Sequence, residues 1–266
     1  MLHFASIHPN IDRALPVKSL SIFISYFFLM LAIPAHAVVG NAPPAAGLVA
    51  RPIVMVVDAD GNLCTGTALG ADLVLTAAHC VTRPIGYQVK VYQTGQSIPV
   101  HIALRHPLFD YASYAASRAT ADVALLKLAA PLPDVVIPTT LAPQRRVTVG
   151  EQLIVAGFGV TLAGTSRGLG QPRMATLSVT GKPGSLQIRL HDAATHNLRN
   201  GLGGCTGDSG APVFDGKGAV VIGLVSWSTA PGDEEGCGGL TGVTPLLLYR
   251  DWIVNTAQKL KSPLKP

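Results

Sequence analysis

Gly207-Asp208-Ser209-Gly210 is the most informative stretch of this sequence. Glycine on both sides of a serine suits a backbone that turns sharply and brings its N–H groups close to a ligand. The alternative is a tight loop without any chemistry, because a tetrapeptide of this kind is a weak signal when it stands alone. Its meaning depends on the segments that accompany it.

Two other segments precede it, Thr76-Ala77-Ala78-His79-Cys80 and Ala121-Asp122-Val123-Ala124-Leu125-Leu126. A serine hydroxyl is a poor nucleophile until a neighbouring imidazole accepts its proton, and the imidazole needs a buried carboxylate to fix its tautomer. Each segment alone is ordinary, since a histidine beside a cysteine often only packs and an aspartate often only caps a strand. Together they predict a catalytic set of His79, Asp122 and Ser209.

The rest of the chain favours β-structure. Among its 266 residues, Gly (28) and Pro (20) are plentiful, and short β-favouring runs recur between turn residues, as in a sandwich or barrel. Only the segment from Pro245 to Leu260 has a helical period. We expect one compact unit or two closely packed barrels. The predicted strands are Ile53–Val57, Leu73–Thr76, Gln88–Tyr92, Val123–Leu128, Gln152–Ala156, Met174–Val179, Leu186–Leu190 and Val220–Trp227.

The N-terminal part of the chain has the features of an export signal. Arg13 and Lys18 precede an apolar stretch from Leu20 to Leu31, and Ala35-His36-Ala37 supplies the small-x-small pattern of a cleavage site. A membrane anchor is the alternative, but the apolar stretch is shorter than the roughly 20 residues that span hydrocarbon. We therefore predict that residues 1–37 are a signal peptide and that the protein is secreted, without stable membrane association.

The charge and the cysteines of the chain limit which partners and bound groups we expect. The net charge of +5 is scattered along the chain, which does not indicate a nucleic-acid partner. Four cysteines in an exported chain predict disulfides, and three pairings remain open. No Cys-x-x-Cys pair and no partner spacing among the histidines indicates a metal site. The histidines considered are His101, His106, His191 and His196.

These motifs together resemble the trypsin and chymotrypsin family of serine peptidases, from Val38 to the C-terminal helix. Val155-Ala156-Gly157-Phe158-Gly159 is similar to the family's Gly-Trp-Gly segment, and Arg250-Asp251-Trp252-Ile253 is similar to the start of its last helix. The resemblance implies an all-β fold of two packed six-stranded antiparallel Greek-key barrels with a C-terminal α-helix, spanning residues 38–266. It places the active site in the cleft between the barrels.

The resemblance also implies roles for individual residues. The backbone N–H groups of Gly207 and Ser209 would form the oxyanion hole. The four cysteines would pair as Cys64 with Cys80 and Cys205 with Cys237. Two disulfides are fewer than animal members commonly have, and this number fits a secreted bacterial member. No metal or organic cofactor is required.

Val38-Val39-Gly40-Asn41 looks like the mature N-terminus of this family, whose free ammonium pairs with the carboxylate beside the nucleophile, here Asp208. Because Ala37 also ends the predicted signal, we expect export itself to release Val38. The alternative is cleavage after Ala35, which would leave a dipeptide to be removed.

The resemblance places Gly203 at the bottom of the primary specificity pocket, where trypsin-like members carry Asp. Without that carboxylate, the P1 residue of the substrate, which precedes the cleaved bond, should be neutral or apolar rather than Lys or Arg. The loop from Thr229 to Gly236 carries three acidic residues, which are a solvated turn or, alternatively, restore a preference for basic residues. Gly204 and Gly242 leave room along the pocket, and the backbone of Ser226, Trp227 and Ser228 pairs with the substrate as an added strand.

The sequence therefore predicts a secreted, monomeric serine endopeptidase that acts on proteins or peptides through an acyl-enzyme and meets proteinaceous inhibitors. One alternative is a catalytically silent homologue that binds a partner on the same scaffold. The other is an unrelated exported barrel in which the three segments match by coincidence.

Overall fold

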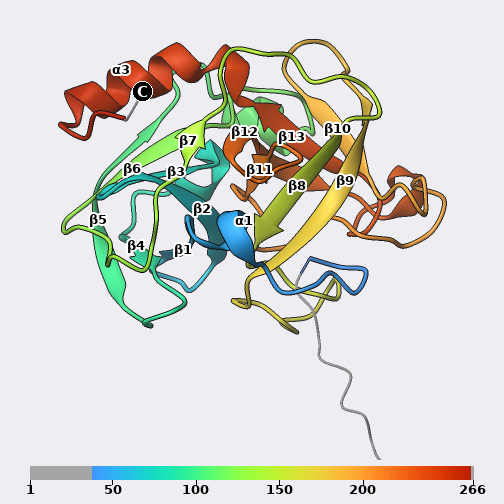
Figure 1. Ribbon diagram of the computed structural model, residues 1–266, viewed down its shortest axis with the longest axis horizontal. Helices are drawn as coiled ribbons and strands as arrows, with labels where there is room; N and C mark the ends of the chain where they lie inside the picture. The colour runs from blue at the N-terminus through green and yellow to red at the C-terminus, as the bar shows by residue number, and fades with distance from the viewer. Residues whose placement is uncertain (1–37, 265–266) are drawn as a thin grey trace, which may run out of the picture. The chain divides into compact units, whose positions relative to one another are not determined.

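The structure is a computed structural model that describes residues 38–264, so the predicted signal peptide lies outside the described residues. This part of the chain is dominated by short strands (Figure 1). The strands are β1 Ile53–Asp58, β2 Leu63–Gly70, β3 Leu73–Thr76, β4 Tyr87–Lys90, β5 Ser97–Arg105, β6 Ala124–Leu128, β7 Thr140–Leu141, β8 Gln152–Gly157, β9 Arg173–Gly181, β10 Ile188–His191, β11 Pro212–Phe214, β12 Val220–Ser228 and β13 Thr241–Pro245. The helices are α1 Gly47–Ala50, α2 Tyr111–Ala115 and α3 Arg250–Lys259, with 3₁₀ turns at Ala78–Val81, Pro231–Asp233 and Leu246–Leu248.

Strands β1 to β6 form a closed antiparallel barrel in the order β1-β2-β3-β6-β5-β4, on the left of Figure 1. Apolar side chains alternate along these strands, so that one face of each points into the barrel. The interior is filled by aliphatic residues with little or no exposure, among them Val54, Val74, Val89, Ile98 and Leu126.

Strands β8 to β13 form a second barrel. Its sheet runs β11-β8-β9-β10-β13-β12, and pairing of β11 with β12 closes it, while β7 adds in parallel at β12. Its core again contains one aliphatic side chain after another, including Leu153, Leu177, Leu190, Val213 and Val243. The prediction of two six-stranded antiparallel barrels is confirmed, and both rings follow the same Greek-key order.

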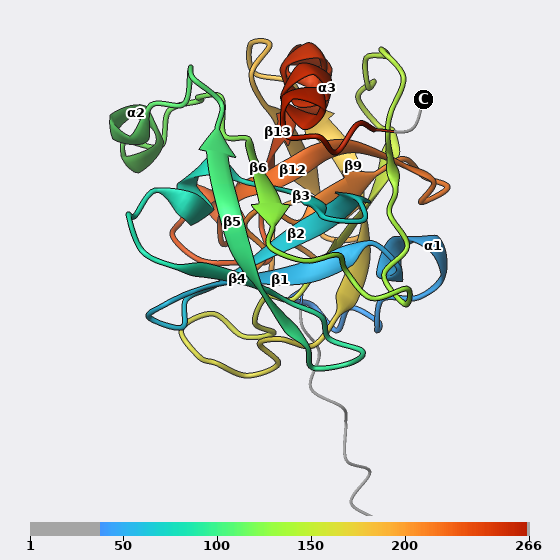
Figure 2. The same ribbon diagram turned by 90° about the vertical axis from the view of Figure 1, so that its left-hand side faces the viewer.

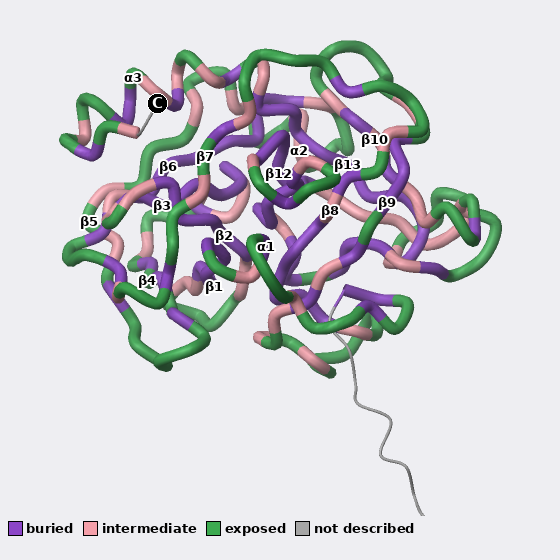
Figure 3. The backbone as a smooth tube through the Cα atoms, in the orientation of Figure 1, coloured by how far each residue is buried: buried purple, intermediate pink, exposed green. Residues whose placement is uncertain are grey.

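A third apolar cluster joins the two barrels. It contains Leu73 and Leu75 from β3, Phe214 and Leu224 from β11 and β12, and Ile253 from α3. Figure 3 shows the resulting pattern, with buried backbone along the strands and exposed backbone in the loops around them. The loops at the junction of the barrels therefore connect strands whose side chains pack in this shared apolar cluster.

The C-terminal helix is shorter than predicted. We expected a helix from Pro245 to Leu260, but Pro245 is the last residue of β13 and pairs with Gly223, so the prediction was wrong at its start. Ser262, which follows α3, accepts a hydrogen bond from Lys127 of β6 at 2.6 Å. Figure 2 shows α3 at the top of the molecule, above β6 and β12. No helix between residues 38 and 264 is long and apolar enough to span a bilayer.

Candidate active site

Two neighbouring strands of the first barrel bring His79 and Asp122 together. Strands β3 and β6 are antiparallel, and Thr76 at the end of β3 lies opposite Ala124 at the start of β6. The chain leaving β3 and the chain entering β6 therefore meet at one edge of the barrel. His79 lies in the 3₁₀ turn just after β3, and Asp122 lies two residues before β6.

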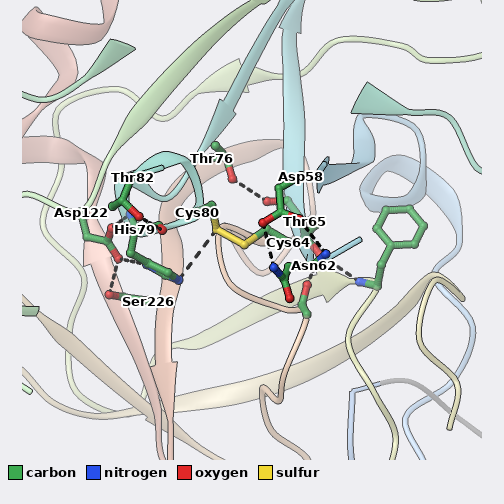
Figure 4. The surroundings of a disulfide bond; sticks show 12 residues. Asp58, Asn62, Cys64, Thr65, Thr76, His79, Cys80, Thr82, Asp122 and Ser226 are labelled. Carbon is green, nitrogen blue, oxygen red and sulfur yellow. Dashed lines mark hydrogen bonds and ion pairs between the residues drawn. A yellow bond between two sulfur atoms is a disulfide. The ribbon is translucent and has the colours of Figure 1, made fainter. Parts of the chain in front are cut away.

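Asp122 is 1% exposed and accepts three hydrogen bonds. The His79 backbone N–H lies 2.9 Å from Oδ1, the His79 Nδ1 lies 2.8 Å from Oδ2, and the Ser226 hydroxyl donates to Oδ2 at 2.6 Å. Figure 4 shows the hydrogen bonds that join this carboxylate to His79 and Ser226. An ionised carboxylate has no proton and can only accept hydrogen bonds. The proton of the imidazole is therefore on Nδ1, and Nε2 has a free lone pair.

Ser209 comes from the second barrel, on the loop before β11, and lines the same cavity as His79. No hydrogen bond joins the Ser209 hydroxyl to His79 between residues 38 and 264; the neighbour of Nε2 is Cys80 Sγ at 3.8 Å. Loose contacts of this kind are common in active sites without substrate and tighten when it binds.

Both glycines beside Ser209 have backbone conformations that other residues rarely adopt. Gly207 has φ +95° and Gly210 has φ +77°. A Cβ at Gly210 would lie 2.2 Å from Thr76 Oγ1 and 2.4 Å from the carbonyl oxygen of Thr65. Glycine at position 210 is thus required by close packing of the serine loop on the first barrel.

Two backbone N–H groups on this loop are unused. In the described chain, neither Gly207 N–H nor Ser209 N–H donates a hydrogen bond, whereas Asp208 N–H donates to Cys205 O and Gly210 N–H donates to Val225 O. Both residues line the cavity that contains His79. These two donors can receive a negatively charged oxygen beside Ser209.

Thr65 of β2 holds the serine loop against the first barrel, and the sequence analysis missed it. Its N–H donates to Ser209 O at 2.8 Å, and its hydroxyl donates to Gly207 O at 2.9 Å. The same hydroxyl accepts a hydrogen bond from Phe158 N–H at 3.1 Å. Nothing in the local sequence marks this threonine, because its partners lie more than 90 residues away.

Asp208, the residue before Ser209, is completely buried. Gly159 N–H donates to Oδ1 at 2.9 Å and Cys205 N–H donates to Oδ2 at 3.0 Å. Burial raises the pKa of the Asp208 carboxyl to about 7, although these two hydrogen bonds act to lower it. A Cβ on Gly157 or Gly159 would lie 2.2 Å or 2.5 Å from this carboxyl group, so the Gly-Phe-Gly segment makes space for it.

The segment predicted as the mature N-terminus packs into the same region. Val38 is fully buried, and Val39 forms an isolated antiparallel bridge with Gly203. Gly40 has φ +88°, and a Cβ there would lie 2.4 Å from Gly201 O. No ion pair involves Asp208 within residues 38–264, so its charge would be uncompensated there.

A cavity of about 550 Å³ lies over Ser209 and is lined by residues from both barrels. Ser226, Trp227 and Ser228 of β12 form one wall, as expected. Gly203, Gly204 and Gly242 are buried and do not line it. The space beside Gly242 is occupied by the Trp227 indole, since a Cβ there would lie 1.9 Å from the ring, while Thr241 lies against Gly203 and Gly204.

Both disulfides contribute residues to the wall of this cavity, namely Cys64, Cys80 and Cys205. Cys64 is bonded to Cys80, the neighbour of His79, with the Cα atoms 6.2 Å apart, and Cys205 is bonded to Cys237 with the Cα atoms 5.0 Å apart. His79 with Cys64 and Cys80 has the spacing of a metal site, but bonded sulfurs are no longer thiolate ligands. This group therefore supports the histidine turn.

Tyr114 of α2 is a second residue that the sequence analysis missed. Its ring stacks on the His79 imidazole, with centroids 4.3 Å apart and planes 11° from parallel. Burial raises the pKa of Tyr114 to about 12, and the nearby Asp122 charge acts in the same direction. The phenol therefore stays neutral and covers one face of the imidazole.

Comparison with known proteins places the chain among trypsin-like proteins. A family model described as Trypsin matches residues 38–253. Anionic trypsin of Bos taurus is 29% identical over 226 residues, covering 77% of this chain and 84% of that protein. Snake venom serine protease rhinocerase 4 of Bitis rhinoceros is 25% identical over 219 residues, covering 76% of this chain and 81% of that protein.

Solved structures show the same fold. Human heparin binding protein is 23% identical, with a TM-score of 0.68, and the match covers 86% of this chain and 100% of that one. Neuropsin, a serine protease expressed in the limbic system of mouse brain, is 22% identical with a TM-score of 0.65, and the match covers 81% of this chain and 98% of that one. At these identities the likeness concerns the fold alone.

Proposed function

Because the chain belongs to the trypsin family through residues 38–253, we propose that it is a secreted serine endopeptidase with Ser209 as nucleophile. His79 is the general base in this proposal and Asp122 orients it. The observation that carries the proposal is the 2.8 Å contact between His79 Nδ1 and the buried Asp122 carboxylate, which leaves Nε2 as the proton acceptor.

The proposed reaction uses these three residues in turn. Ser209 Oγ attacks the carbonyl carbon of the substrate and passes its proton to His79 Nε2. The carbonyl oxygen becomes negative and accepts hydrogen bonds from Gly207 N–H and Ser209 N–H, each worth roughly 3 to 4 kcal/mol in the transition state. His79 then protonates the leaving amine as the C–N bond breaks, and water hydrolyses the acyl-enzyme by the same steps in reverse.

An extended peptide would bind along β12, with backbone hydrogen bonds to Ser226 and Ser228 and its P1 side chain in the cavity over Ser209. Among the described residues that line this cavity, the only acidic one is Asp58, and its carboxylate is already paired with Arg83. We therefore propose a neutral or apolar P1 residue, and proteinaceous inhibitors that occupy the same cleft of a monomeric enzyme.

Activation is proposed to depend on the N-terminal end. Removal of residues 1–37 during export would create an ammonium group on Val38. Val38 is buried in the core of the second barrel, and Asp208 is also fully buried. A cation there would neutralise a carboxylate that now lies in a low-dielectric site. The Ser209 loop would then be held in its working geometry.

A serine-directed fluorophosphonate tests the proposal. We expect covalent labelling of the protein that begins at Val38, cleavage of a peptide reporter with Phe or Leu at P1, and loss of both in Ser209→Ala. Absence of labelling in a folded protein would instead favour the silent homologue that only binds a partner. A strong preference for Arg at P1 would contradict the neutral pocket.

A further inference from the structure

Three residues form a row across the outer face of the second barrel. Gly242 of β13 lies opposite Trp227 of β12 on one side and opposite Arg189 of β10 on the other. Side chains of residues paired across a sheet point to the same face. Because Gly242 has no side chain, the Trp227 indole lies across it and reaches towards Arg189.

Arg189 points away from the core. Its neighbours on β10, Ile188 and Leu190, are buried inside the barrel, so the alternation of the strand places Arg189 on the outside. Its guanidinium carbon lies 5.9 Å from the centroid of the Trp227 ring, within the range of a cation–π contact.

The charge of Arg189 has no acidic partner in the described chain. None of the ion pairs between residues 38 and 264 includes it, and its Nε atom is buried without a hydrogen-bond acceptor. The other two guanidinium nitrogens are not among the buried unpaired atoms, and a ligand carboxylate can accept hydrogen bonds from them. The indole fixes its position beside the cleft.

Trp227 connects this cation to the candidate active site, because it lines the same cavity as His79 and Ser209. In the proposed binding mode, the P1 residue of a substrate paired with β12 would lie at Ser226, and the residues before P1 would continue past Trp227. Arg189 lies 5.9 Å from the Trp227 ring, so their side chains would come near its guanidinium.

We propose that Arg189, held on Trp227, binds an acidic side chain of the substrate at the third or fourth residue before the cleaved bond (P3 or P4). This inference rests on the proposed function and names its substrate class: chains with Asp or Glu shortly before a neutral P1 residue. Glu234 and Glu235, on the loop after β12, are exposed to solvent, and none of the ion pairs in the described chain joins them to Arg189.

The test compares reporter peptides that share one P1 residue and differ only by Glu or Gln at P3 and at P4. At low ionic strength we expect kcat/KM to be about two- to fivefold higher for a Glu peptide, as for other exposed ion pairs, and the ratio to approach one in high salt. Arg189→Met should bring the ratio to about one, whereas Arg189→Lys should retain part of it. Arg146→Met, at an exposed arginine elsewhere, is the matched control and should leave the ratio unchanged.

Equal cleavage of the Glu and Gln peptides by the unaltered protein would overturn this inference and leave the proposed peptidase intact. An unchanged Glu preference in folded Arg189→Met would do the same. If neither peptide is cleaved, the proposed function fails instead. The role of Arg189 is then tested separately by measuring the Kd of each peptide for Ser209→Ala by fluorescence anisotropy. Equal Kd values for the two peptides would reject Arg189 as the acid-binding residue.

Discussion

At the scale of single residues, Gly210 shows how tightly the nucleophile loop is packed. Its Cβ position is occupied by Thr76 Oγ1 and the backbone of Thr65, both in the first barrel. The loop that carries Ser209 belongs to the second barrel, so this glycine lies where the two barrels touch. Any side chain there would push the nucleophile away from His79.

We predict that Gly210→Ala lowers the free energy of unfolding by about 2 to 4 kcal/mol, because it combines positive-φ strain with a backbone clash. Gly95→Ala is the matched control: its φ is also positive, at +70°, but nothing lies within 4 Å of its Cβ position. The control should lose only about 1 to 2 kcal/mol. Urea unfolding measures both, and equal losses would show that strain alone, not packing, accounts for the effect.

The sequence predicted His79, Asp122 and Ser209 because chemistry restricts which residue types can do this work, and each lies in a distinctive segment. Thr65 and Tyr114 could not be predicted in this way, since a threonine in a strand and a tyrosine in a short helix have many ordinary roles. Their importance comes from contacts across the fold, 2.8 Å to Ser209 O and 4.3 Å to the His79 ring.

At the scale of elements, the eight predicted strands are present, whereas β2, β5, β7, β11 and β13 were not predicted. β3 has the predicted bounds Leu73–Thr76. β2 and β13 were missed because Leu63–Gly70 and Thr241–Pro245 are rich in Gly and Thr, and neighbouring strands rather than their own propensity hold them in place.

β12 has a register shift between Val225 and Trp227. Such a bulge re-aims side chains, and here Ser226 meets Asp122 while Trp227 faces the cleft.

The two disulfides offer a prediction at this scale. They close loops of 16 and 32 residues, and chain entropy predicts a loss of about 3 kcal/mol when the shorter is removed and about 0.6 kcal/mol more for the longer. Only the shorter anchors the turn of His79. We therefore expect Cys64→Ala with Cys80→Ala to reduce kcat more than Cys205→Ala with Cys237→Ala does.

Unfolding experiments and reporter cleavage at a temperature where both double variants remain folded provide the measurement. A larger loss of kcat in the Cys205–Cys237 variant would contradict the role assigned to the histidine turn.

At the scale of the whole molecule, both barrels repeat one strand order, and the candidate site is built only where they meet. His79 and Asp122 follow from the β3–β6 edge of the first barrel, whereas Ser209 and Ser226 come from the β11–β12 edge of the second. Composition and periodicity predict β-structure but contain nothing about closure or about which edges face each other. That information came from the family resemblance, since contacts between the barrels, such as that of Ser226 with Asp122 across 104 residues, leave no local pattern.

The N-terminal end and Asp208 provide the last prediction, which concerns the molecule as a whole. Burial raises the pKa of Asp208 to about 7 from an ordinary value of 3.8. Between pH about 4 and 7 the folded chain therefore binds a proton that the unfolded chain has lost, so the free energy of unfolding falls as pH rises through this window. The loss amounts to a few kcal/mol. If a free ammonium on Val38 pairs with Asp208, the charged form is stabilised and the loss should disappear.

Chains that begin at His36 and at Val38 differ by two residues and isolate this effect. We expect the His36 chain to lose stability between pH 4 and 7 relative to the Val38 chain, as measured by urea unfolding across that range. Asp208→Asn should abolish the difference, because the neutral amide cannot respond to the ammonium. Parallel pH profiles of stability for the two unaltered chains would show that the Val38 ammonium does not pair with Asp208. The working geometry of Ser209 would then have to be maintained by Thr65 and the flanking glycines alone.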